Sequence, residues 1–310
     1  MVIVDSSTNK EWKPRPPKKS PEEILAEIRE NGLVLTPKAL GPWSHSKLKM
    51  LQSCHLQFLL QYILKVKVPN RPVDLVTETG KAAHRVLELV ISGISLEKAF
   101  SQTKEEYKGI IPDSHWESHL ATIEFNIIKF MEKIKNLEKS YKIKQIFQEL
   151  RIGCTDTWAP TEFFADDVYF RGVIDLVLLL DNDDLIIIDH KYGAPAIMGL
   201  KYYLNQLDTY KILFHKGVTP IEGATSGIHF IKDGETLLGL HSSKEEIDTT
   251  ILGKLEFYIE GAVEGLLEKG EFRHTVCTAC KYCDFKETCK AKGYKKLEDE
   301  SKNWFNIRKV

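Results

Sequence analysis

The sequence predicts an α/β fold in which a central mixed sheet is flanked by helices. Three strand-like segments follow one another in the middle of the chain, and the second and third are nearly continuous apolar runs. Such runs are typical of central strands that are covered on both faces. Segments with apolar residues at helical spacing precede and follow these strands, an order that indicates an α/β core. With 310 residues, of which 43% are hydrophobic, the chain can bury such a core.

The first 40 residues are expected to contribute little to the folded body. Residues 1–20 are polar and rich in proline, so they predict a flexible arm. Ser20 and Pro21 then predict the start of a short helix, because serine is a preferred N-cap and proline is tolerated at the first helical position. Further helices are expected at 44–64 and at 80–93, which form an N-terminal helical elaboration.

The remaining elements follow in a regular order. We expect strands at 145–153, 167–180, 184–193 and 224–232, and helices at 200–217 and 244–270. The turn DNDD (181–184) predicts a hairpin between the second and third strands. The predicted domains are an arm with a short helix (1–40), a folded domain (41–289) with a helical insertion at about 95–140, and a basic tail (290–310).

Charge and hydropathy exclude some classes of protein. A net charge of -1 argues against a protein that coats nucleic acid through bulk charge, so any nucleic acid must be bound in a local groove. No segment approaches the roughly 18 consecutive apolar residues of a membrane span, and the first residues lack the pattern of a secretory signal. We therefore expect a cytoplasmic protein with no membrane partner.

Two acidic residues lie inside apolar strands. An unpaired charge at Asp175 or Asp189 would be costly, so a compensating group is expected there. Two carboxylates at the ends of adjacent strands form an oxygen-rich pocket that suits Mg²⁺ or Mn²⁺. Lys191 shares a strand face with Asp189, and a lysine there can orient a water molecule and stabilise charge on a phosphate. The alternative is that all three are ordinary strand-end residues; their coincidence favours a site.

Four short motifs occur in a fixed order along the chain. They are G-x-x-x-H in GKAAH (80–84), G-x-x-D in GVID (172–175), D-x-K in DHK (189–191) and Q-x-x-x-Y in QLDTY (206–210). With their matching secondary structure, residues 44–289 resemble the RecB-like branch of the PD-(D/E)XK nuclease superfamily. The resemblance implies a restriction-endonuclease-like fold with a C-terminal cysteine cluster.

The resemblance also implies a role for each motif residue. His84, Asp175, Asp189 and the backbone carbonyl of His190 would bind the metal ion, and Lys191 would be the catalytic lysine. A histidine at position 190 departs from the family, in which a large hydrophobic or aromatic residue commonly separates the aspartate from the lysine. Because the implied ligand is the carbonyl, the departure should not abolish metal binding.

Further residues have both a functional and a structural interpretation. Glu149 matches an acidic position on the first strand of the family and is expected to line the metal site. Gln206 and Tyr210 share a helix face, so they either position the scissile strand and support catalysis or are ordinary helix residues. Glu88, one turn after His84, either orients the His84 ring or is a surface acid.

The six cysteines favour metal or redox chemistry over a disulfide framework. Four lie close together at 277, 280, 283 and 289, a spacing that allows a zinc site or an iron–sulfur cluster. Cys154, on a predicted strand, is expected to be a buried small hydrophobic residue.

Resemblance to AddB-type and CRISPR-adaptation nucleases implies a [4Fe–4S] cluster held by Cys54, Cys280, Cys283 and Cys289. Cys277 is an alternative fourth ligand, which would favour a local structural Zn²⁺ site instead. The neighbouring Lys281, Tyr282, Phe285 and Lys286 are expected to contact single-stranded DNA through stacking and charge.

The sequence thus predicts a Mg²⁺- or Mn²⁺-dependent deoxyribonuclease. By resemblance it would be an exonuclease that trims single strands or duplex ends in DNA recombination, repair or processing, with a helicase, recombinase or CRISPR integrase as a partner. The alternatives are a catalytically silent DNA-binding or assembly subunit and a site-specific endonuclease, although no additional recognition domain is visible.

Overall fold

The computed structural model describes residues 2–5, 19–67, 74–193, 197–275, 280, 283–286, 289, 299 and 302. The chain divides into two compact units. The first comprises Met1–Asn9, Pro72–Gly153 and Gly172–Leu252, and the second comprises Lys10–Arg71, Cys154–Arg171 and Gly253–Val310.

A mixed sheet confirms the predicted fold class. Its strands are β1 (Val2–Asp5), β2 (Ile143–Cys154), β4 (Phe170–Leu180), β5 (Asp184–Lys191), β6 (Gly223–Phe230) and β7 (Glu235–Ser243), in the order β1-β2-β4-β5-β6-β7, and β3 (Pro160–Thr161) pairs with β2. β4 and β5 form the predicted antiparallel hairpin. β5 and β6 are parallel, as expected for strands joined by a helical crossover. β6 and β7 are again antiparallel.

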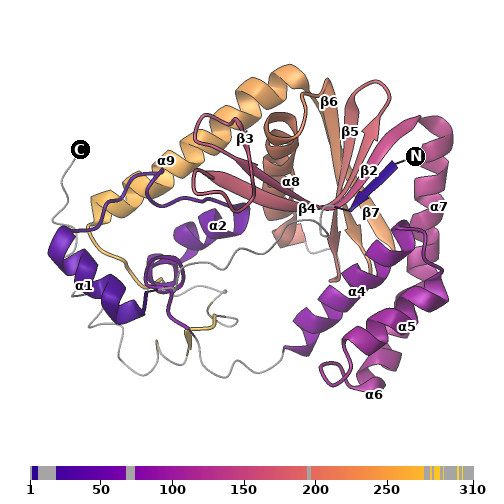
Figure 1. Ribbon diagram of the computed structural model, residues 1–310, viewed down its shortest axis with the longest axis horizontal. Coiled ribbons are helices and arrows are strands. Elements are labelled where there is room, and N and C mark those ends of the chain that lie inside the picture. Colours follow the sequence, from indigo (N-terminus) through magenta and orange to yellow (C-terminus); the bar gives the residue numbers. More distant parts are fainter. Residues whose placement is uncertain are drawn as a thin grey trace. The chain divides into compact units, whose positions relative to one another are not determined.

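Helices of the first unit cover both faces of this sheet (Figure 1). The longer ones are α4 (Leu75–Ile91), α5 (Leu96–Glu106), α7 (Glu124–Ser140) and α8 (Ile197–Gly217), and short helical turns lie at α6 (Asp113–His115), η2 (Trp116–Leu120), η3 (Ala121–Ile123) and η4 (Glu246–Ile251). α4, α5 and α7 pack with β4 and β5 in one hydrophobic core, and Figure 1 shows α8 on the opposite face. The central position of β5 explains its apolar run, since its six middle residues are all buried.

Helix α4 is the element that carries the predicted histidine. Asp74 caps it by accepting a hydrogen bond from the Val76 backbone N–H. Its buried stripe consists of Thr79, Ala82, Ala83, Val86, Leu87 and Ile91. His84 comes directly after Ala83 and is only half-buried. Its ring therefore lies at the edge of the core, where it can contact a ligand.

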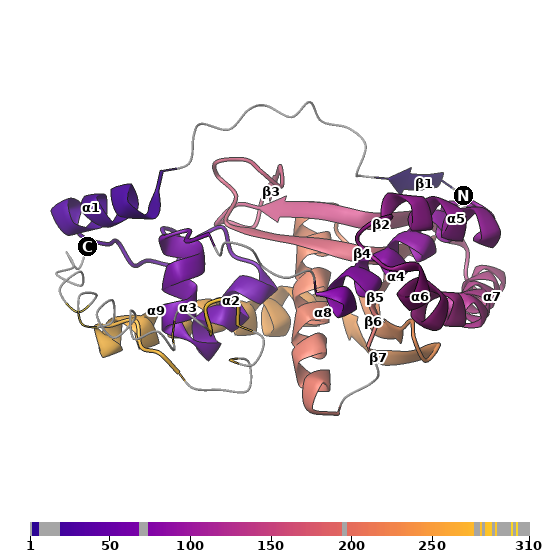
Figure 2. The ribbon, with the colours of Figure 1, turned by 90° about the horizontal axis from the view of Figure 1, so that it is seen from below.

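The second unit contains α1 (Pro21–Asn31), α2 (His45–Ser53), α3 (His55–Phe58), η1 (Leu59–Ile63) and α9 (Leu252–Lys269), as Figures 1 and 2 show. Ser20 caps α1 in a reciprocal capping box with Glu23, which confirms the predicted helix start. Trp43 forms a parallel bridge with Phe170 and is fully buried. This bridge ties the segment before α2 to the start of β4.

Three of the described strands, β1, β3 and β7, are not predicted from the sequence. Val2–Asp5, assigned from sequence to a flexible arm, form β1 and pair in parallel with β2 (Figure 2); residues 6–18 of that arm lie outside the described residues, as does most of the tail at 290–310. β7 is an edge strand with exposed leucines, of which Leu240 is 89% exposed. A strand is recognised in a sequence by apolar residues on the face that it buries, and no residue of β7 is buried.

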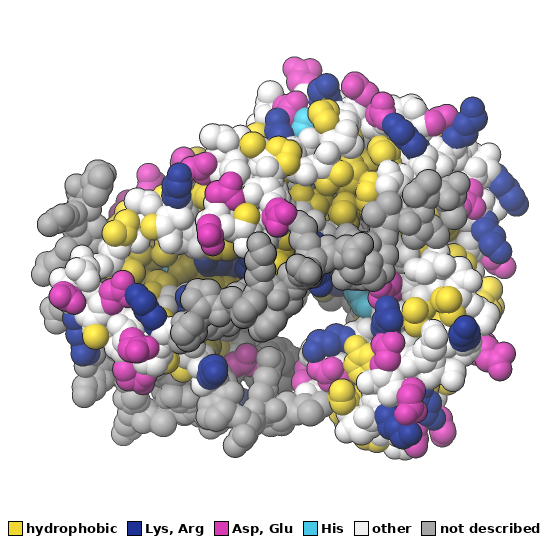
Figure 3. Space-filling model, viewed as in Figure 1, with side chains coloured by type: hydrophobic (Ala, Val, Ile, Leu, Met, Phe, Trp, Pro, Cys, Tyr) yellow, Lys and Arg dark blue, Asp and Glu magenta, His cyan; other side chains and the backbone are white. Residues whose placement is uncertain are grey.

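The visible surface mixes acidic and basic side chains, in keeping with the near-zero net charge (Figure 3). Among the described residues, no helix is both long enough and apolar enough to cross a membrane.

Candidate active site

The two predicted aspartates lie opposite each other at the end of the β4–β5 hairpin. Leu176 pairs with Ile188, so Asp175 and Asp189 take the next positions of the antiparallel ladder. The His190 backbone N–H donates a hydrogen bond to Asp175 Oδ2 over 2.7 Å. The carboxylate of Asp175 is therefore held by the neighbouring strand.

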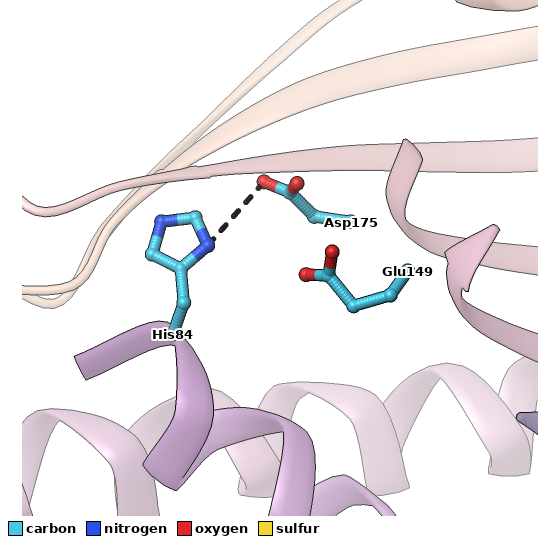
Figure 4. A group of neighbouring side chains, drawn as sticks. All are labelled: His84, Glu149 and Asp175. Carbon is cyan, nitrogen blue, oxygen red and sulfur yellow. Dashed lines mark ion pairs between the residues drawn. The ribbon is translucent and has the colours of Figure 1, made fainter. Parts of the chain in front are cut away.

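His84, Glu149 and Asp175 converge on one point (Figure 4). Each offers a ligand atom, and these atoms all lie within 4.8 Å of one another. His84 Nδ1 is 3.8 Å from Asp175 Oδ2. Figure 4 shows the three side chains pointing toward one another from α4, β2 and β4. One imidazole nitrogen and two carboxylates form a donor set that can hold a divalent cation.

Glu149 reaches this point through an irregular backbone. Its φ angle is +46°, which is rare for a residue with a side chain. Along β2, Gln148 and Leu150 are buried and Glu149 is half-buried. Such strained residues cluster at functional sites.

The acids of the site disfavour one another in the absence of a cation. Burial, followed by the nearby Asp175 and Glu88 carboxylates, raises the pKa of Glu149 to about 8. Burial also raises the pKa values of Asp175 and Asp189, and the charge of Asp175 raises that of Asp189 further. Burial lowers the pKa of His84, which favours the neutral imidazole that a metal ion requires. A bound cation would compensate the crowded carboxylates, so the residues fit a metal ion.

Asp189 is held differently from Asp175. Its Oδ2 atom lies 2.6 Å from Lys191 Nζ, and only 1% of Asp189 is exposed. Asp189 is not among the three residues whose ligand atoms converge, and its role as a metal ligand stays a prediction. Its carboxylate anchors the predicted catalytic lysine.

Gln206 and Tyr210 lie beside the aspartates. Gln206 Nε2 donates to the Tyr210 hydroxyl over 2.6 Å. Burial raises the pKa of Tyr210, and so do Asp175 and Asp189, which places the hydroxyl near both carboxylates. A Cβ atom at Gly172 would lie 2.7 Å from Leu213 Cδ1, so the glycine of GVID makes room for α8.

Comparison with known proteins identifies the family. A model of the PD-(D/E)XK nuclease superfamily matches residues 42–290. The chain belongs to this superfamily. Membership implies a nuclease, a hydrolase of phosphodiester bonds, and nucleases of this superfamily use divalent metal ions. No curated protein matches the chain. The crystal structure of SSO0001 is similar over 80% of this chain and 96% of that chain, with 14% sequence identity and a TM-score of 0.28.

Two further residues near the nuclease site have partners that the sequence did not reveal. Glu88 accepts a hydrogen bond from Arg85 Nη1 over 2.9 Å, and its role in orienting His84 stays a prediction. The His190 ring contacts His229, whose Nδ1 atom lies 3.1 Å from His190 Nδ1. No sequence motif marks His229, because the two histidines meet only through the pairing of β5 with β6.

The described cysteines of the nuclease lie in the second unit. Burial, followed by the Cys54 and Cys280 thiols, raises the pKa of Cys283, so these three side chains are neighbours. Cys54 lies between α2 and α3, with Sγ 4.0 Å from the Arg273 carbonyl oxygen. The Cys289 backbone N–H donates to the Phe285 carbonyl. The described cysteines are free of disulfides.

Burial tests two further predictions for the second unit. Cys154 is fully buried, which confirms its predicted role as a small hydrophobic residue. Phe285 is only 2% exposed, so the prediction that it stacks on DNA is wrong: its ring is already packed inside the protein. Cys277, Lys281 and Tyr282 lie outside the described residues.

Proposed function

We propose that the chain is a Mg²⁺- or Mn²⁺-dependent deoxyribonuclease. The observation that carries this proposal is the convergence of His84, Glu149 and Asp175 within 4.8 Å, in the same unit as the Lys191–Asp189 pair. The raised pKa values of the carboxylates support a cation site, since a divalent ion would stabilise their charged forms.

The metal ion would supply Lewis-acid chemistry, by polarising the scissile phosphate and lowering the pKa of water. His84 would contribute a neutral imidazole nitrogen, and Glu149 and Asp175 would contribute oxygens. The His190 N–H restricts Asp175 to one orientation, which limits the reorganisation needed on binding. The His190 carbonyl remains a proposed additional ligand.

The remaining site residues would act on the DNA strand. Lys191, anchored by Asp189, would stabilise the negative charge that develops on the phosphate. Its Nζ atom also lies 5.3 Å from the Tyr203 ring, which helps to confine it. The hydrogen-bonded pair of Gln206 and Tyr210 would position the scissile strand beside the aspartates.

We further propose exonuclease activity on single strands or duplex ends, in DNA recombination, repair or processing alongside a helicase, recombinase or integrase. Support for this mode is the resemblance of the four motifs to RecB-like nucleases. The test uses labelled linear single-stranded DNA, blunt duplex DNA and circular single-stranded DNA with Mg²⁺, Mn²⁺ or EDTA. An exonuclease degrades only the linear substrates, and only with metal. Cleavage of the circle would assign an endonuclease, and metal-independent binding with no cleavage would assign a catalytically silent DNA-binding subunit.

For the second unit we propose a [4Fe–4S] cluster held by Cys54, Cys280, Cys283 and Cys289. The proximity of Cys283 to both Cys54 and Cys280 supports this assignment. Four thiolates are a usual ligand set for such a cluster. A link between Cys54 and the C-terminal cysteines would close a long loop and thereby stabilise the fold. A structural Zn²⁺ site that includes Cys277 is the competing assignment.

A further inference from the structure

His190 stands where a hydrophobic residue was expected, and the structure shows what its side chain does. The ring is 4% exposed and its Nδ1 atom lies 3.1 Å from Nδ1 of His229, which is fully buried. The two residues are direct partners in the parallel β5–β6 ladder. The departure at position 190 is thus matched by a second histidine on the next strand.

The histidine pair packs against an aromatic ring of α7. Phe130 of α7 stacks on His229 with ring centroids 4.0 Å apart and meets His190 edge-on at 5.3 Å. The Nε2 atoms of both histidines are buried, and neither has a hydrogen-bond partner among the described residues. Burial lowers the pKa of both rings, so one neutral imidazole donates through Nδ1 and the other accepts. This single hydrogen bond is therefore the only polar contact that fixes the His190 ring in the described part of the chain.

The backbone of His190 belongs to the metal site. Its N–H donates to Asp175 Oδ2 over 2.7 Å. A hydrogen bond with the His190 backbone also raises the pKa of His84, and the His84 and His190 rings meet edge-on at 5.9 Å. One residue thus contacts two of the three side chains that converge on the candidate metal position.

We propose that His229 is a positioning residue for this metal site: its hydrogen bond to the His190 ring holds the peptide that orients Asp175 and His84. The inference rests on the proposed metal-binding function. Without His229, the His190 ring would be buried with no polar partner, a costly arrangement that rotation of the residue would relieve. Where the backbone of β5 shifts with the ring, the peptide moves, and so do its contacts with Asp175 and His84. Residues that orient metal ligands in this indirect way typically change metal affinity by about 10- to 100-fold when removed.

The test measures Mn²⁺ binding to the full chain without DNA, by following free Mn²⁺ with electron paramagnetic resonance, alongside thermal unfolding. His229→Leu removes the hydrogen bond and should raise the Mn²⁺ dissociation constant about tenfold or more. His229→Asn places an amide close to the position of Nδ1 and should restore affinity to within about twofold of the wild type. His229→Gln places its amide farther out, near the position of Nε2, and should bind as weakly as His229→Leu.

His215→Leu is the matched control. His215 is also a buried histidine of the first unit, 5% exposed, and it bonds to Asp248 and to the Ile221 backbone N–H. Its removal should lower thermal stability comparably while leaving Mn²⁺ affinity unchanged.

Three outcomes would overturn the proposal: wild-type affinity in His229→Leu, equal weakening in His215→Leu, or no difference between the asparagine and glutamine variants. If His229→Leu does not fold, the difference in Mn²⁺ affinity between the asparagine and glutamine variants still tests the proposal. A wild-type protein that binds no Mn²⁺ would instead overturn the proposed metal site itself.

Discussion

Lys191 Nζ lies 2.6 Å from Asp189 Oδ2, and this pair separates the roles of two aspartates that look alike in the sequence. The Asp175 carboxylate converges with the side chains of His84 and Glu149, whereas the Asp189 carboxylate holds Lys191. Asp175→Asn should therefore weaken Mn²⁺ binding about tenfold or more, and Asp189→Asn should weaken it less while still lowering the cleavage rate. Calorimetric titration of both variants with Mn²⁺ checks this order. Equal losses of affinity would make Asp189 a ligand of the same rank.

The strained backbone at Glu149 predicts a difference between two small replacements. Both Glu149→Ala and Glu149→Gly remove the carboxylate, but only glycine relieves the φ angle of +46°. In metal-free protein, we expect the glycine variant to be more stable than the alanine variant by about 1 kcal/mol. Denaturant unfolding measures the difference. An alanine variant as stable as the glycine variant would show that this conformation is not strained.

The pKa of Glu149 predicts how the stability of the metal-free protein depends on pH. Its folded-state pKa of about 8 lies above its ordinary value. The protonated carboxyl therefore contributes stability that is complete at low pH and is lost as pH rises through about 8. The melting temperature of the wild type should fall between about pH 4.5 and pH 8 relative to that of Glu149→Gln, and level off above this range.

That comparison removes contributions from other groups, including Lys47, whose pKa burial lowers to about 8 and whose effect has the opposite sign. Saturating Mn²⁺ should abolish the pH-dependent fall in the melting temperature of the wild type, because the cation stabilises the charged Glu149 carboxylate. Parallel pH profiles for the wild type and Glu149→Gln would contradict the assignment.

Much of this site is predictable from sequence because it depends on local pattern. Asp175, Asp189 and Lys191 stand out as charged residues in apolar strands, and both strands lie where the pattern predicts them. His84 was placed on a helix by the periodicity of its neighbours, and α4 confirms that helix. In each case the signal lies within a few residues of the position.

Other features depend on contacts between distant segments and left no such signal. The positive φ angle at Glu149 occurs without a glycine to mark it. The partnership of His190 with His229 requires the register of β5 against β6, which the crossover through α8 determines. β7 was missed because its leucines are exposed, so no alternation of buried and exposed positions reveals the strand.

The cysteine assignment predicts distinct outcomes for three variants. Anaerobically purified wild type should be brown and contain iron, and Cys54→Ser should lose both the colour and the iron. Cys277→Ser should retain them, as should the control Cys154→Ala, since Cys154 is a fully buried residue of β2. Metal analysis and visible absorption check these expectations. A colourless, zinc-containing wild type, or loss of metal in Cys277→Ser alone, would favour the zinc site.

The central claim is that this site cleaves DNA with a divalent metal ion and Lys191. The most direct measurement is the single-turnover cleavage rate of end-labelled single-stranded DNA by wild type and Lys191→Ala, with Mn²⁺ and with EDTA. We expect cleavage by the wild type only with Mn²⁺, and a rate about 10²- to 10³-fold lower for Lys191→Ala with unchanged folding. Cleavage that persists in EDTA, or a Lys191→Ala variant as fast as the wild type, would contradict the claim.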